Sequence, residues 1–433
     1  MMEGICILIF TILFAWVAWR RLDWAIALVL FLLPTYQFRF TLWSVPMTFL
    51  EIMLLVIIVI WLIHRIRSKS FKKIHWPWKW LTLGFFLAGV IAVIVSPDTR
   101  GALGLWKAYI VEPLLFFYVF VNVMKSSKHW RLALFSLGAS VVVIGFVALI
   151  EYIGLIPGIE PYISQIPPRA TSLFLFPTAI GKYVGPLVAL FLGFLLVTKS
   201  NSELKDKNAW LGKAFFIGVV TFGLIGLLLS ISRGAILGVF AALIFVSFFS
   251  QWKKWLWLGL GLLVVVIILI PQTRDQLNSV VSGDDVSTDV RLVMWKGTLR
   301  LIQDKPIFGA GLAGFPIVYA DYKEASHTEF FPNPDHLILT LWVEMGILGL
   351  IIFGWIIVRF FTSGIHTLRS VNHIHKTLIV ALFAAMIAFV VHGFVDTPYF
   401  KNDLAVIFWV LIGLLIVISI KSIETGQNSK NTL

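Results

Sequence analysis

Charged residues are scarce in this sequence. Only 13% of the 433 residues are Asp, Glu, Lys or Arg, whereas a soluble domain carries about 25%. Hydrophobic residues make up 59% of the chain, and the mean hydropathy is +0.93. Apolar runs long enough to cross a bilayer recur along the whole chain and leave no room for a water-soluble domain of ordinary size. The sequence therefore predicts a single membrane domain over residues 1–433.

Cysteine is almost absent, and several catalytic motifs are missing. The only cysteine is Cys6, which excludes an intramolecular disulfide. The chain contains no Walker A, H-E-x-x-H or G-x-S-x-G motif, which excludes the commonest ATPases, zinc proteases and α/β-hydrolases. The N-terminus lacks a basic n-region and an A-x-A-like cleavage site, so we expect a retained helix rather than a signal peptide.

Two short motifs do not fit their context. Residues 309–314 match G-x-G-x-x-G, but they follow a predicted helix and Pro306 rather than a strand, so we do not expect a nucleotide site. We expect these glycines to let the loop fold back closely on the membrane domain. The pair His373-x-His375 lacks nearby Cys or carboxylate ligands. We therefore predict neither a metal ion nor a cofactor.

The net charge of +13 predicts membrane topology rather than nucleic-acid binding. Lys and Arg gather in short segments between the apolar runs, which is the positive-inside pattern of cytoplasmic loops. The basic segments are residues 20–21, 65–79, 125–131, 199–213, 253–254 and 359–376.

The alternation of apolar and basic segments predicts an all-α, polytopic integral membrane protein with about twelve or thirteen transmembrane helices. If the first run does not cross the membrane, the count is twelve and both termini lie inside; otherwise the N-terminus lies outside. The predicted spans are residues 4–19, 22–37, 47–63, 80–96, 105–124, 132–153, 177–197, 214–230, 234–250, 255–271, 337–358, 377–395 and 403–420.

Two longer segments fall on the predicted non-cytoplasmic side. The first, residues 154–176, is rich in proline. The second, residues 272–335, is a large and acidic external or periplasmic loop. Within it, residues 287–303 predict a short amphipathic surface helix, because an N-cap precedes them and Pro306 follows them. Its apolar stripe contains Leu292, Trp295, Leu299 and Ile302.

Three arginines lie on this outer side. Arg233 occupies a hairpin between two apolar runs, Arg291 lies on the loop helix with Trp295 one turn later, and Arg169 lies in the proline-rich segment. A guanidinium near the membrane is costly unless it is paired, snorkels or faces a polar cavity. Each arginine can also be explained as an ordinary snorkelling or solvated side chain.

A histidine and an acid follow at the start of the late span 337–358. His336 opens this span and can accept a proton from an attacking hydroxyl, or simply cap the helix. Glu344 lies about 12 Å deeper, where an acid is either functional or paired with a neighbouring helix. Together, three arginines and one histidine predict a pyrophosphate-binding site with a base beside it, because guanidinium groups bind phosphate oxygens in a bidentate manner.

At this point the chain resembles the O-antigen ligase and O-antigen polymerase family of bacterial envelope enzymes, which have many spans and a large periplasmic loop before the last helices. The resemblance rests on motifs in a characteristic order. They are Arg169-Ala170-Thr171-Ser172 with Pro177, Ser232-Arg233-Gly234-Ala235, Arg291-x-x-x-Trp295, Pro306-Ile307-Phe308-Gly309-Ala310-Gly311, His336-Leu337, Val343-Glu344-Met345-Gly346-Ile347-Leu348-Gly349, and the segment 392–404 with Asp396.

The resemblance implies a metal-independent, inverting glycosyltransferase of the GT-C type in the bacterial inner membrane, active on its periplasmic or external side. Its donor would be an undecaprenyl-pyrophosphate-linked glycan and its acceptor a glycan or lipid-glycan. By resemblance, Arg233 and Arg291 would bind the pyrophosphate, Arg169 is a weaker candidate for the same site, and His336 would be the catalytic base. Glu344 and Asp396 would have supporting roles.

The motifs do not distinguish a ligase from a polymerase that joins carrier-linked repeat units, or from a protein O-oligosaccharyltransferase, because all three need the same leaving group and base. A transporter of lipid or polysaccharide is an alternative from a different class. The intramembrane charges Lys107, Glu112 and Glu344 fit a transporter, but the chain shows no internal repeat.

Overall fold

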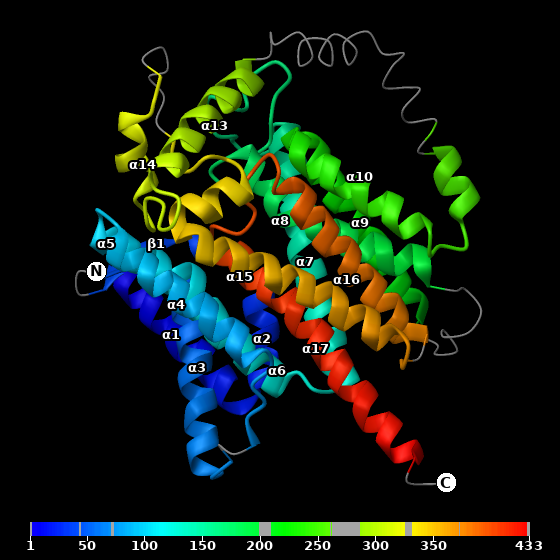
Figure 1. The fold of residues 1–433 in the computed structure, drawn as a ribbon. Coiled ribbons are helices and arrows are strands. Elements are labelled where there is room, and N and C mark those ends of the chain that lie inside the picture. Colours follow the sequence, from blue (N-terminus) through cyan, green and yellow to red (C-terminus); the bar gives the residue numbers. More distant parts are fainter. Residues whose placement is uncertain are drawn as a thin grey trace.

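The structure, a computed structural model, is an all-α polytopic membrane protein (Figure 1). It describes residues 2–42, 45–70, 73–198, 209–259, 261, 286–324, 331–371 and 373–430. In these residues, 8 helices are long and apolar enough to cross a membrane. They are Phe49–Arg67, Thr99–Val123, Ser127–Tyr152, Pro177–Val197, Leu211–Ser230, Leu337–Leu368, His373–His392 and Asn402–Ile420.

Four further apolar helices are shorter, and each occupies a predicted span. They are Ile7–Arg20, Leu22–Phe31, Lys79–Val95 and Arg233–Ser247. The predicted span 255–271 lies largely outside the described residues, as do residues 272–285 and 325–330 of the predicted loop.

The helices follow one another along the chain with few other elements. Their bounds are α1 (Met2–Arg20), α2 (Leu22–Phe31), α3 (Phe49–Arg67), α4 (Lys79–Val95), α5 (Thr99–Trp106), α6 (Glu112–Val123), α7 (Ser127–Tyr152), α8 (Pro177–Val197), α9 (Ala209–Ser230), α10 (Arg233–Ser247), α13 (Val286–Asp304), α14 (Phe315–Val318), α15 (Leu337–Leu368), α16 (His373–His392) and α17 (Asn402–Lys430). A π-helical turn, Lys107–Val111, joins α5 to α6, and 3-10 turns occupy Leu33–Gln37 and Tyr319–Asp321.

The second predicted span differs from the structure. Helix α2 ends at Phe31, and a 3-10 turn that contains Pro34 follows it. Proline has no N–H to continue a helix, which explains why the apolar run 22–37 does not form one helix. A two-stranded antiparallel hairpin of β1 (Arg39–Leu42) and β2 (Val45–Thr48) then leads into α3.

Packing brings together helices that are distant in the sequence. Helix α8 packs against α9, α10 and α16, while α15 packs against α4, and α17 against α6 (Figure 1). Residues 404–418 of α17 are buried almost without exception. The arrangement therefore places the last helix at the centre of the bundle and leaves the ends of α8, α10 and α16 side by side.

Helix α15 is broken where the glycine-rich loop meets it. Gly346 has φ 68° and ψ 178° inside the helix, a conformation that glycine adopts readily. The freed backbone groups bond the loop, since Ile347 N donates to Ile307 O at 3.0 Å and Ala310 N to Val343 O at 2.7 Å. A side chain at Gly309 would meet the Val343 carbonyl. The expectation that these glycines let the loop fold back on the membrane domain is confirmed.

Candidate active site

The proline-rich segment carries Arg169 to the end of α9. Its backbone is anchored first on Glu151, a buried residue of α7 that accepts hydrogen bonds from the Thr171 N–H and hydroxyl. The Arg169 side chain then crosses to α9, where its Nε donates to the Ser230 carbonyl at 3.1 Å. The arginine is therefore held beside the turn that carries Arg233.

Arg233 is the first residue of α10 and follows a tight turn. Ile231 has φ 51°, a left-handed conformation rare for a β-branched residue, and Ser232 occupies the N-cap position. The next residue, Gly234, packs directly on α16: a Cβ there would lie 2.7 Å from His392 Cδ2. This close approach ties the Arg233 turn to the end of α16.

The three predicted arginines lie near one another although they come from three elements. Burial lowers the pKa of Arg169, and the charges of Arg233 and Arg291 lower it further. Like charges in a partly buried site repel one another, so a bound anion would stabilise the cluster. This arginine cluster consists of Arg169, Arg233 and Arg291.

Helix α13 carries Arg291 and contacts His336 through Trp295. It occupies the positions of the predicted surface helix 287–303, and Trp295 lies one turn after Arg291. The Trp295 Nε1–H donates to the Pro334 carbonyl at 2.8 Å. Its ring lies perpendicular to the His336 ring, with centroids 5.1 Å apart and planes at 88°. The tryptophan thus holds the face of α13 that bears Arg291 against the start of α15.

His336 is the N-cap of α15. Its Nδ1 accepts a hydrogen bond from the Leu339 N–H at 3.5 Å, so the neutral ring carries its proton on Nε2. Burial lowers the pKa of His336, which favours the neutral form at pH 7. The structure therefore shows the capping contact. The lowered pKa also favours the neutral ring, which is the charge state that a base requires.

A buried Lys–Asp pair lies next to the arginine cluster; Asp396 was predicted as a supporting residue, whereas Lys182 was not predicted. Lys182 Nζ lies 2.7 Å from Asp396 Oδ1, and His392 Nε2 lies 3.7 Å from Asp396 Oδ2. Burial alone would raise the pKa of Asp396, but Lys182 and His392 hold it below its usual range. Lys182 is an ionisable residue inside the apolar run 177–197, which is the signal that identifies it as a functional candidate.

Asp335 interacts electrostatically with both members of this pair and with Arg291. Burial and the charge of Asp396 raise its pKa, while Lys182, Arg291 and Lys401 act in the opposite direction. Its backbone has φ 48°, a conformation that asparagine and aspartate tolerate better than most residues. The sequence places Asp335 only at the end of the acidic loop 272–335, since its conformation and neighbours depend on the tertiary fold.

Glu344 contacts the glycine-rich loop that contains Ala313. It is buried in α15, where its Oε2 accepts a hydrogen bond from the Ala313 N–H at 2.7 Å. Ala313 belongs to the glycine-rich loop and has φ 57°. Glu344 therefore anchors the loop between α13 and α14 to the broken part of α15.

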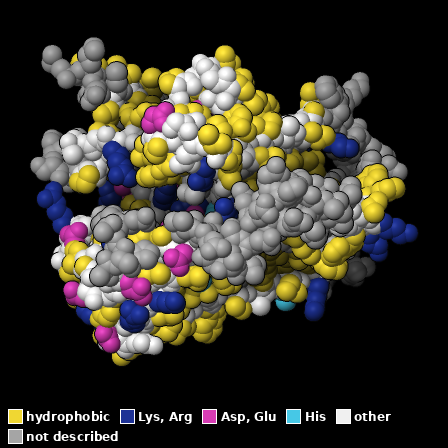
Figure 2. All heavy atoms as spheres, turned by 90° about the horizontal axis from the view of Figure 1, so that it is seen from above, with side chains coloured by type: hydrophobic (Ala, Val, Ile, Leu, Met, Phe, Trp, Pro, Cys, Tyr) yellow, Lys and Arg dark blue, Asp and Glu magenta, His cyan; other side chains and the backbone are white. Residues whose placement is uncertain are grey.

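The end of the bundle that carries α13 and α14 is hollowed. Figure 2 looks onto the end that carries α13 and α14, where Lys and Arg side chains are seen in a hollow beside a largely hydrophobic rim. Among the residues that the structure describes, no group of three or more His, Cys, Asp or Glu residues could hold a metal ion.

A comparison with protein families gives the context for this geometry. Residues 217–354 match the family model described as O-antigen ligase, which confirms the resemblance to the O-antigen ligase and polymerase family. The matched segment contains Arg233, Arg291, His336 and Glu344, whereas Arg169 and Asp396 lie outside it. No curated protein matches the chain.

Proposed function

We propose that this chain, a multi-pass membrane protein with an O-antigen ligase domain, transfers a glycan from an undecaprenyl-pyrophosphate carrier to an acceptor hydroxyl in envelope polysaccharide synthesis. The observations that carry the proposal are the mutual electrostatic interaction of Arg169, Arg233 and Arg291, and the position of Arg291 on α13, whose Trp295 packs on the ring of His336. Guanidinium groups bind pyrophosphate oxygens through paired hydrogen bonds and neutralise the charge that builds on the leaving group.

The proposed reaction is a single displacement. The acceptor oxygen attacks the anomeric carbon, the bond from that carbon to the pyrophosphate oxygen breaks, and undecaprenyl pyrophosphate leaves with the electron pair. Attack opposite the leaving group inverts the anomeric configuration. The arginine cluster supplies the positive charge in this scheme, so the displacement proceeds without a metal ion.

His336 accepts the hydroxyl proton in this scheme. Its Nδ1 accepts from Leu339 at 3.5 Å, which is at the long limit for a hydrogen bond. For Nε2 to accept the proton, the ring's own proton must sit on Nδ1, and the capping contact is then given up. Asp335 and the Lys182–Asp396 pair position the segment around His336 and balance the charge of the arginines.

The proposed orientation places this site on the periplasmic or external side of the bacterial inner membrane. The support is the distribution of the basic segments, which the positive-inside rule assigns to the cytoplasm. The donor enters from the bilayer, and the acceptor is a glycan or a lipid-glycan.

Transfer from a purified lipid-pyrophosphate glycan by the reconstituted chain tests the proposal, with wild type measured beside His336→Ala. Transfer by wild type alone supports both the enzyme and the base. Carrier-linked product that grows in length identifies a polymerase, whereas glycan on a new lipid or protein acceptor identifies a ligase or an O-oligosaccharyltransferase. Movement of lipid or glycan across the bilayer without transfer by either protein identifies a transporter and rejects the proposal.

A further inference from the structure

A second polar site lies at the other end of the bundle, far along the helices from α13. It is a pocket of about 380 Å³ where α1 ends, α3 and α6 end, and α7 begins. This is the end that the basic segments assign to the cytoplasm. The residues that line the pocket include Trp19, Arg20, Arg21, Asp23 and His129.

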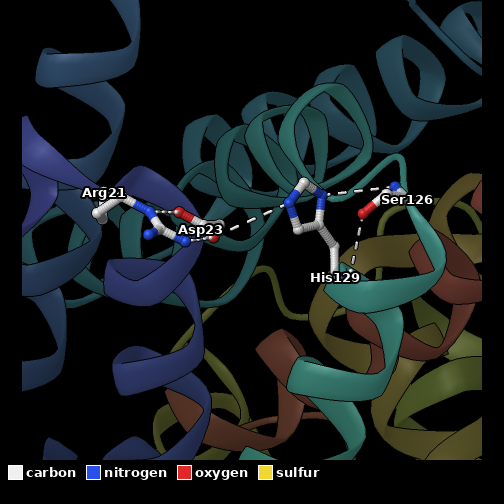
Figure 3. Close-up of polar contacts among 4 residues, drawn as sticks. All are labelled: Arg21, Asp23, Ser126 and His129. Atoms are coloured by element: carbon white, nitrogen blue, oxygen red, sulfur yellow. Dashed lines mark hydrogen bonds and ion pairs between the residues drawn. The ribbon is translucent and has the colours of Figure 1, made fainter.

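Cationic and proton-bearing groups from distant parts of the chain converge on this pocket. Arg21 Nη2 lies 2.8 Å from Asp23 Oδ2, and His129 Nε2 lies 3.9 Å from the same oxygen, so both groups lie beside one carboxylate (Figure 3). Arg20 adds a second guanidinium to the lining. The two arginines outweigh the one acid, and the pocket is positive even with its histidines neutral.

Two helix N-termini add to the positive potential. Helix α7 begins at the pocket with a capping box, in which the His129 N–H donates to Ser126 Oγ and the Ser126 N–H to His129 Nδ1 (Figure 3). Helix α2 begins directly after Arg21. Helix N-termini carry partial positive charge and favour phosphate groups.

An apolar surface leads from the pocket into the membrane. One face of α1 stays uncovered by the rest of the chain, and the exposed fraction of Trp16 on that face is 63%. Trp19, which lines the pocket, lies at the end of this face, with the Arg67 guanidinium 4.9 Å from its ring centroid. The other exposed residues of the face are Ile5, Leu8, Ile9, Ile12 and Leu13.

From this juxtaposition we propose that the pocket binds the phosphate headgroup of an acidic phospholipid, whose acyl chains lie along the exposed face of α1. A phosphodiester matches the guanidinium groups and helix N-termini, while the chains cover apolar surface that the protein leaves open. A soluble phosphate would bind in the pocket but would not contact the exposed apolar face of α1. The site is separate from the arginine cluster, so the test of lipid binding does not depend on the proposed glycan transfer.

The test measures retention of phosphatidylglycerol and of phosphatidylcholine by the full chain in detergent, by native mass spectrometry. Phosphatidylglycerol should be retained preferentially. The double variant Arg20→Gln/Arg21→Gln should weaken its retention about 25-fold, at about fivefold for each cation near a membrane surface. Asp23→Asn should strengthen retention, a result that misfolding does not produce. The control Lys253→Gln/Lys254→Gln removes the same charge from another predicted cytoplasmic segment and should change nothing.

Equal retention of the two lipids would overturn the proposal, as would equal losses in the arginine and lysine variants. Competition by glycerol 3-phosphate as effective as that by the intact lipid would also overturn it and assign the pocket to a soluble phosphate. A chain dimer that forms through α1 and displaces the lipid would assign the apolar face to a second copy instead.

Discussion

The rings of Trp295 and His336 meet at right angles, with centroids 5.1 Å apart. Trp295 belongs to α13, whereas His336 caps α15, so this contact joins the helix that carries Arg291 to the proposed base. The indole N–H also donates to the Pro334 carbonyl. The position of the arginine relative to the histidine therefore depends on a residue that performs no chemistry itself.

Replacing Trp295 should lower transfer without removing a reacting group. Trp295→Ala loses a perpendicular aromatic contact and a hydrogen bond, together about 2 kcal/mol, so we expect a loss of about thirtyfold in kcat/KM. Trp295→Phe keeps the ring contact and should show a smaller loss. The exposed Trp255 provides the control, since Trp255→Ala should retain wild-type activity. Full activity in Trp295→Ala would show that α13 is held without this contact.

The two roles of His336 can be separated by substitution. Asparagine is among the best N-caps, so His336→Asn keeps the capping contact but cannot act as a base, whereas His336→Ala loses both. Both variants should lose about 10²-fold or more in kcat, and only His336→Ala should also lose about 1 kcal/mol of stability. An active His336→Asn variant would show that the histidine serves as a cap alone.

The rate of transfer should depend on pH through His336. Burial lowers its pKa below the ordinary value of about 6.5. The base must be neutral, so kcat/KM should be constant above pH 7 and should fall as the pH drops through this lowered pKa. The measurement is a pH profile of wild type between about pH 5 and 8. An inflection above 6.5, or the same acid limb in His336→Asn, would assign the titration to another group.

Much of the fold could be predicted because apolar length and basic segments constrain a membrane protein strongly. The limits of the prediction are local. Pro34 ends α2 early, and Gly346 breaks α15 inside a largely apolar run. The break depends on the loop that supplies hydrogen bonds to the freed backbone, and no pattern within 337–358 indicates it.

The candidate site was likewise predicted only in part. Arg169, Arg233, Arg291 and His336 were selected from the sequence as an outer-side group, and their roles stay predictions. Lys182 was missed although it lies in an apolar run. The environments of Asp335, Lys182 and Asp396 come from packing between α8 and the segment after α16, which residue spacing does not reveal.

The Lys182–Asp396 pair should matter for stability. Its side chains are only 11% and 9% exposed, and removing one partner of a buried pair costs about 3–5 kcal/mol. Lys182→Met should therefore lower the Tm strongly, and the double variant Lys182→Met/Asp396→Asn should recover much of the loss. Arg21→Gln, which breaks an exposed pair, should change the Tm little. Thermal unfolding of the purified wild type and of the three variants gives the Tm values to be compared.

The most direct test of the arginine cluster is release of undecaprenyl pyrophosphate from a labelled donor by the reconstituted chain. Lysine keeps the charge but not the forked geometry, so Arg233→Lys and Arg291→Lys should each reduce release by about 10²–10³-fold. Arg300→Lys lies on the same helix as Arg291, where Arg300 pairs with Glu324 at 3.5 Å, and should match wild type. Wild-type release by Arg291→Lys and Arg233→Lys would contradict the claim that these guanidinium groups bind the pyrophosphate.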